Sequence, residues 1–123
     1  MDVQNSDVVS GSLQISVDVI AKIARLAAME VEGVAQVRAE TLSAKNLLGK
    51  TLPKPVTVEL VDGIAEITVS IAARYGCKIP AVSEKVQQSV KTAVQNMTGI
   101  TVSKVNLVVV GVVMDEDDDT AEG

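Results

Sequence analysis

The sequence predicts a two-layer α+β domain in which two helices pack on a mixed sheet of four or five strands. Two segments show helical spacing of apolar residues, and between them lies a hairpin with strict polar and apolar alternation. The chain has 123 residues, the length of one domain and enough to bury a core without disulfides. We therefore expect a single domain over 10–114, with flexible tails at 1–9 and 115–123.

The first half of the chain predicts a strand, a helix and a second short strand. Residues 11–15 alternate polar and apolar side chains, as a strand buried on one face would. Ser16 is suited to cap a helix that runs to about Glu32. Gly33 is placed to end this helix in a left-handed conformation, and a second strand is expected over 34–39.

The middle of the chain carries the clearest pattern. Residues 56–61 and 64–71 alternate around Asp62-Gly63, a dipeptide that favours a tight two-residue turn. This arrangement predicts a hairpin with one buried and one solvated face. The preceding segment, 40–55, has three lysines, two prolines and weak periodicity, and we interpret it as a long surface loop.

The second half predicts a helix followed by a strand. Pro80 fits the first turn of a helix that ends at Gly99, and the strand begins at Ile100. From residue 105 this strand is apolar on both faces, so its second face needs a cover, either the loop over 40–55 or a partner chain. The candidate partner-binding residues on that face are Val108, Val110 and Val112.

The composition excludes several classes of function. The chain has no His, Phe or Trp and a single tyrosine, Tyr75. Histidine-dependent triads and His-containing zinc sites are therefore absent, as is an aromatic platform for stacking nucleic-acid bases. A net charge of -5 also repels a phosphate backbone. We predict no catalytic, cofactor-binding or metal-ligating residues and no nucleic-acid partner.

Two remaining features, Cys77 and the acidic run 115–119, have both a functional and a purely structural interpretation. Cys77 precedes Lys78 and a helix N-terminus, a setting that can activate a thiol, but without a resolving cysteine we favour a small residue in a turn. The acidic run 115–119 lacks the turn glycine and spaced ligands of a calcium loop. We expect this run to be a disordered, solvated tail.

The expected cellular location rests on two features of the sequence. Residues 1–12 show neither the basic nor the apolar region of a signal peptide. The longest apolar stretch, 107–114, is far shorter than the roughly 20 residues of a spanning helix. We expect a cytoplasmic protein.

Several segments together resemble the alkaline shock protein family, the envelope stress response proteins of Gram-positive bacteria. The order and spacing of these segments over residues 10 to 113 carry the resemblance, although family members often have a His in the last strand. The matching segments are Gly11-Ser-Leu-Gln-Ile-Ser16, Val19-Ile20, Ile23-Ala24, Glu30-Val-Glu-Gly-Val34, Tyr75-Gly76, Ile79-Pro80, Val86-Gln87, Val90, Met97-Thr-Gly-Ile100, Val105-Asn106 and Val110-Gly111-Val112.

The resemblance implies a non-enzymatic cytoplasmic protein of the alkaline or cell-envelope stress response. Such proteins self-associate and are in some cases held at the inner face of the membrane by an anchored protein partner. We therefore expect function through protein–protein contacts, as a homo-oligomer or with such a partner, and no small-molecule substrate. The alternative is a small regulatory subunit that binds an enzyme of envelope or lipid synthesis.

Overall fold

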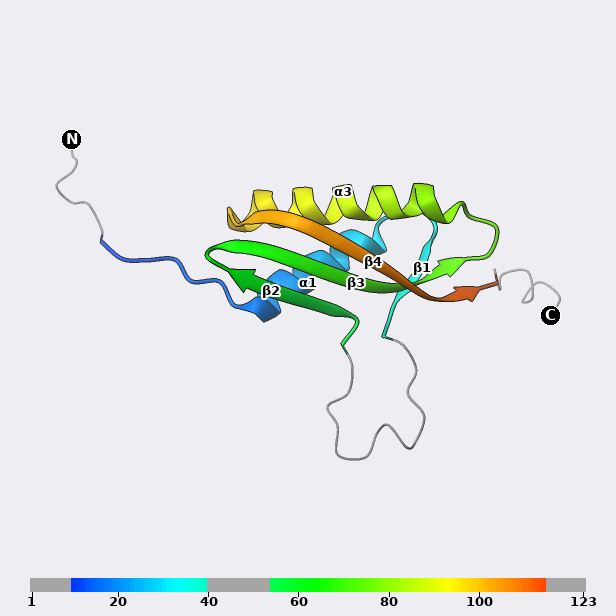
Figure 1. Ribbon diagram of the computed structural model, residues 1–123, viewed down its shortest axis with the longest axis horizontal. Coiled ribbons are helices and arrows are strands. Elements are labelled where there is room, and N and C mark those ends of the chain that lie inside the picture. The colour runs from blue at the N-terminus through cyan, green and yellow to red at the C-terminus, as the bar shows by residue number, and fades with distance from the viewer. Residues whose placement is uncertain (1–9, 40–53, 115–123) are drawn as a thin grey trace, which may run out of the picture.

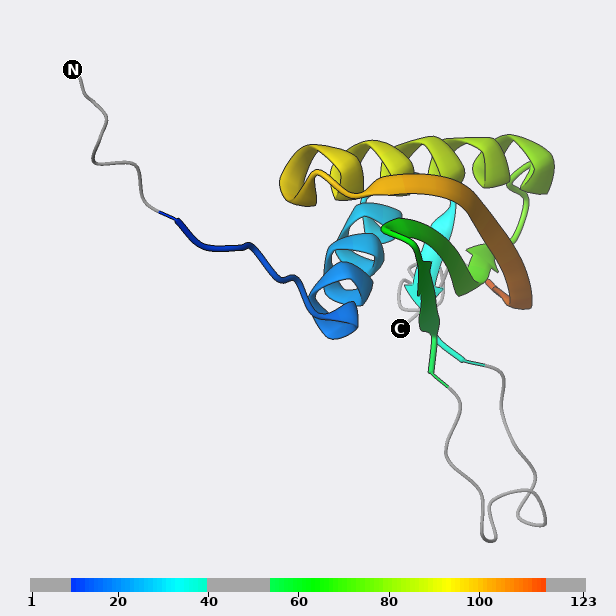
Figure 2. The same ribbon diagram turned by 60° about the vertical axis from the view of Figure 1, so that its left-hand side comes forward.

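The computed structural model describes residues 10–39 and 54–114. The expected tails and most of the expected basic loop lie outside these ranges. The elements follow the order α1 (Val17–Met29), β1 (Val34–Val37), β2 (Val56–Val61), β3 (Ile64–Arg74), α3 (Ile79–Thr98) and β4 (Thr101–Val113). Both helices lie on one side of the sheet (Figure 1, Figure 2). The predicted α+β architecture is confirmed, with four strands in the described residues.

The central strand β3 organises a sheet of mixed direction. β2 pairs antiparallel with residues 64–69 of β3, and β1 pairs antiparallel with residues 71–73. β1 and β2 therefore follow one another along the same edge of β3. The opposite edge of β3 pairs in parallel with β4 over residues 64–74. The described sheet is thus three strands wide, and β4 forms one complete edge.

The strand expected over 11–15 is absent, so this prediction is wrong. Residues 10–16 pair with no described strand. Residues 10–14 run away from the body of the domain as an extended segment (Figure 1, Figure 2). The alternation of side chains predicts an extended conformation, but a strand also needs a partner strand within reach, and no described strand pairs with this segment.

Ser16 and Gly99 cap the helices as predicted, but Gly33 does not cap α1, because the C-cap of that helix is Glu30 in a right-handed conformation. The Ser16 Oγ accepts a hydrogen bond from the Val19 N–H at 3.2 Å, and Gly99 ends α3 with a left-handed φ of 77°. Helix α1 ends at Met29, three residues before the predicted end at Glu32. The N–H groups of the next two residues donate to carbonyls three positions back, which tightens the chain into a turn.

The hairpin between β2 and β3 has the predicted tight turn. Asp62 and Gly63 both have positive φ, 56° and 76°, as a two-residue turn of this hand requires. Val61 pairs with Ile64 next to the turn, and the register continues without interruption to Val56 and Val69. β3 extends to Arg74, three residues further than the alternation predicted.

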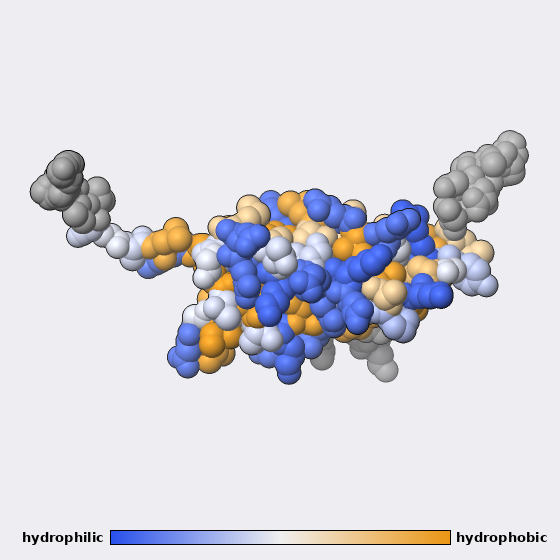
Figure 3. Space-filling model, turned by 90° about the horizontal axis from the view of Figure 1, so that it is seen from above, coloured by the Kyte–Doolittle hydropathy of each residue, from blue (hydrophilic) through white to orange (hydrophobic). Residues whose placement is uncertain are grey.

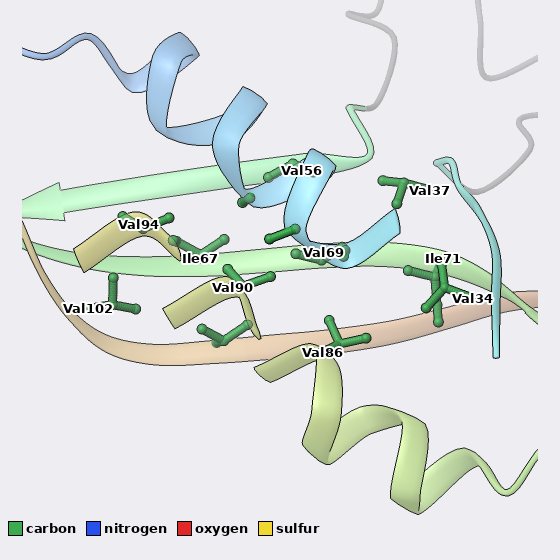
Figure 4. Close-up of a cluster of buried hydrophobic side chains, with 14 of the residues drawn as sticks. Val34, Val37, Val56, Ile67, Val69, Ile71, Val86, Val90, Val94 and Val102 are labelled. Carbon is green, nitrogen blue, oxygen red and sulfur yellow. The ribbon is translucent and has the colours of Figure 1, made fainter. Parts of the chain in front are cut away.

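The core lies between the helices and the inner face of the sheet and is wholly aliphatic (Figure 4). None of the described polar or charged residues is buried as a whole. Alanines at 24, 27 and 28 let α1 approach closely, and the Ser89 Oγ of α3 donates to the Ala27 carbonyl at 3.1 Å. The largest fully buried side chains are Ile20, Ile67, Val69, Ile71, Val86, Val90, Val94 and Val102.

Gly33 permits a close approach between the turn after α1 and helix α3. Its φ is +103°, and a Cβ at this position would lie 2.5 Å from the Val82 Cγ2 atom. Val82 is itself buried in the core. Both the backbone conformation and the lack of space therefore require glycine here.

We predict that Gly33→Ala destabilises the domain more than Gly76→Ala does. Gly76 has a similar φ of +93° but no neighbour within 4 Å of the added Cβ, so that variant reports backbone strain alone. We expect a loss of about 1 to 2 kcal/mol for Gly76→Ala and a further 1 kcal/mol or more, roughly, for Gly33→Ala from overpacking. Urea unfolding monitored by circular dichroism measures both. Equal losses would contradict the close-approach argument.

Candidate interaction surface

The face of the sheet that points away from the helices is the candidate functional surface. Along β3, the side chains of Ala65, Ile67, Val69 and Ile71 are fully buried in the core. The residues between them therefore point to the opposite face. Neither described helix covers that face, which we call the outer face (Figure 2).

The first part of the outer face is polar and internally satisfied. The side-chain amide of Asn106 on β4 donates to the Glu66 Oε2 atom at 3.1 Å and to the Thr68 Oγ1 atom at 3.3 Å, both on β3. These bonds join neighbouring strands and satisfy the amide donor locally. This part of the face thus resembles an ordinary solvated sheet surface.

The next part of the outer face is apolar. Val108 follows on β4, where it pairs with Ser70, and its side chain is 44% exposed. Val110 is half-buried and occupies an irregular position, because the register passes from Val109 opposite Ile71 to Gly111 opposite Ala72. Val110 is therefore an extra residue in β4, of the kind that forms a β-bulge.

This irregularity separates Val112 from the other two candidate valines. Val112 is 52% exposed and pairs with Ala73, whose side chain belongs to the core cluster. Because paired residues in a ladder share a face, Val112 does not share the outer face with Val108. Strict alternation in the sequence placed all three valines together, and it could not reveal the extra residue that changes the face.

Arg38 covers the far end of the outer face. Its backbone N–H donates to the Ser70 carbonyl, and its Nη2 atom lies 2.5 Å from the position of a Cβ on Gly111. The side chain therefore crosses β3 to reach β4. Ala72 lies beneath this path and is fully buried although it stands outside the core cluster. The Arg38 Nε atom is buried without a hydrogen-bond acceptor among the described residues.

Other chemically suggestive residues do not gather into a site. Cys77 is half-buried and packs against the core cluster. Within 10–39 and 54–114, no group of three or more Cys, Asp or Glu residues is placed to hold a metal ion. Neither helix of the described ranges has the length and hydropathy needed to cross a membrane.

Comparisons with known proteins identify relatives over most of the chain. The model of the alkaline shock protein 23 family, described by a cell envelope-related function, matches residues 5–114. The uncharacterized protein YqhY of Bacillus subtilis (strain 168) is 32% identical over 117 residues, which cover 94% of this chain and 87% of YqhY. The uncharacterized protein Spy1535 of Streptococcus pyogenes serotype M6 is 32% identical over 107 residues, 86% of this chain and 82% of Spy1535.

Solved structures show only a weaker likeness. The manganese form of a MamM CTD variant aligns with 78% of this chain and 99% of its own, at 11% identity and a TM-score of 0.49. This score is too low to establish a shared fold.

We predict that the stem of Arg38, and not its charge, stabilises the outer face. Arg38→Ala uncovers Ala72 and is expected to cost about 1 kcal/mol. Arg38→Met keeps an apolar stem and removes the unpaired Nε donor, so its stability should equal or exceed that of the wild type. Urea unfolding of the two variants measures the difference, and equal losses in both would show that the guanidinium charge matters instead.

Proposed function

The chain belongs to the alkaline shock protein family, whose function is related to the cell envelope, and we propose that it acts without catalysis, through protein–protein contacts of its sheet. The first partner in this proposal is a second copy of the chain. A role in the stress response and a cytoplasmic location, which the sequence resemblance implies, belong to the same proposal.

One observation carries the proposal: Val108 is exposed on an outer face that no described helix covers. It lies beside the half-buried Val110, on a strand that forms a complete edge of the described sheet. Fully burying a valine side chain contributes about 1.5 kcal/mol or more. Exposed apolar side chains on an edge strand are typical of an interaction site.

The surroundings of the single cysteine support a role without catalysis. Cys77 packs against the aliphatic core beside Gly33, where the cysteine Cβ lies 3.6 Å from the position of a glycine Cβ. A reactive thiol usually lies in an electropositive and accessible setting. The contacts of Cys77 favour a packing role. The whole sequence also contains no histidine that could serve as its base.

We predict that Val108→Asp weakens self-association. A carboxylate placed in an apolar contact must lose its hydration without gaining a partner, so the assembly should dissociate at concentrations where the wild type remains associated. Light scattering coupled to size exclusion measures the mass relative to the 12.8 kDa monomer. Val19→Asp on α1 is the matched control, because Val19 is 48% exposed and Val108 is 44% exposed.

Two results would contradict this proposal. A wild-type chain that stays at monomer mass at all concentrations would exclude self-association, and equal behaviour of both variants would exclude the outer face as the site of contact.

Affinity capture from cells with the wild type and Val108→Asp then distinguishes the remaining classes of partner. A membrane-anchored protein lost only in Val108→Asp would place an anchored partner on this face. An enzyme of envelope or lipid synthesis would instead indicate a regulatory subunit.

A further inference from the structure

We propose that the N-terminal arm, residues 10–14, of one copy adds as a strand to the free edge of β4 in a second copy. This inference rests on the proposed self-association and specifies which elements meet. The segment has the pattern of a strand, and the edge is the outer one of β4; among the described residues neither has a strand beside it.

The N-terminal arm is exposed and extended. Leu13 is 79% exposed, the highest exposure among the large hydrophobic side chains of the described residues. Ile15 packs against the core cluster and fixes the base of the arm. The segment before Ile15 leaves the body of the domain, and Figure 3 shows hydrophobic atoms exposed along this projection. A leucine at such a position is costly in water unless another surface covers it.

The free edge of β4 is long and carries few of the features that usually prevent strand addition. Natural edge strands carry charged residues or proline, or are short. β4 has 13 residues and no proline, and Lys104, at the start of its regular stretch, is its one charged residue. By contrast, β2 has six residues, follows Pro55 and carries Glu59. Between the two exposed edges, β4 is the one suited to receive a strand.

The register of β4 limits where the arm can pair. Pairing with β3 is irregular at Ser103 and at Val110, because each is an extra residue between successive partners. Regular pairing continues over 104–109, a stretch of six residues. Since bulges interrupt a ladder, this stretch is the natural place for an added strand. Its length suits the five residues of the arm.

A groove beside the same stretch offers space for Leu13. The groove lies between α3 and β4 and has a volume of about 680 Å³. Val105 is its one apolar lining residue, and the polar ones include Glu84 and three lysines, Lys85, Lys91 and Lys104. The aliphatic stems of lysines can pack against a leucine while their ammonium groups remain in water. An added strand that turns Leu13 toward α3 therefore buries it in this groove.

The arm must come from a second copy. Helix α1, from which the arm extends, packs against β1 and β2, whereas α3 packs against β4. The arm therefore starts at the edge of the sheet opposite to β4, and it runs away from its own body (Figure 1, Figure 2). If each of two copies binds the arm of the other, they form a closed dimer. If each copy binds the arm of the next in a head-to-tail arrangement, they form an open chain.

Leu13→Asp tests this inference with Ser12→Asp as the matched control. Both variants add one carboxylate to the arm, but only the first removes the apolar anchor. We expect Leu13→Asp to raise the dissociation constant of the assembly about tenfold or more, and Ser12→Asp to change it much less. Sedimentation velocity over a concentration series measures these constants. Because Leu13 lies outside the folded body, unfolding curves of both variants should match that of the wild type.

Amide hydrogen exchange followed by NMR locates the pairing. Within residues 104–109, the backbone amides that point away from β3 should exchange slowly in the assembled wild type. In Leu13→Asp these amides should exchange rapidly, while the amides bonded to β3 stay protected. Rapid exchange of the outward amides in the assembled wild type would overturn the inference. So would normal assembly of Leu13→Asp. If Val108→Asp still dissociates in that case, the proposed function stands and another pairing, such as β4 with β4, replaces the arm.

Discussion

The structure depends on the pairing of β3 along both of its edges. This strand alternates core residues with outer ones, and each inner residue from Ala65 to Ile71 is fully buried. β1 and β2 share one edge and β4 occupies the other. Because α3 connects β3 to its parallel neighbour, the helix is brought back over the inner face. The positions of both the core and the outer face follow from this one strand.

The aliphatic composition determines how closely the layers approach. With no Phe or Trp in the sequence, the core is filled by Val, Ile and Ala. Small side chains let the packed elements approach closely, which explains why Gly33 lies so near Val82 of α3 and why the Ser89 hydroxyl reaches the backbone of α1. Cores of this kind leave little free space, so added atoms are poorly tolerated.

A chain without clustered reactive side chains in its described parts has its distinctive chemistry on its surface. The outer face changes along β4 from a polar part around Asn106 to an apolar part around Val108. The N-terminal arm carries the most exposed large hydrophobic residue, Leu13. These features lie on different sides of the domain, which suits contacts between copies better than contacts within one copy.

Local pattern in the sequence was sufficient to predict both helices, the hairpin, the caps at Ser16 and Gly99, and the class of fold, but not the C-cap of α1 at Glu30. Alternation, a Ser cap, an Asp-Gly turn and glycine stops act over a few residues, so their physical causes can be read from the chain itself. The same pattern also predicted a second apolar face on this strand that includes Val108, although the face of Val112 depends on an extra residue in β4. Tertiary structure alone decided which strands found partners: residues 11–15 have the alternation of a strand, but no described strand pairs with them. Strand pairing depends on segments distant in sequence, and for that reason the arm, the free edge of β4 and the position of Arg38 could not be predicted from local pattern.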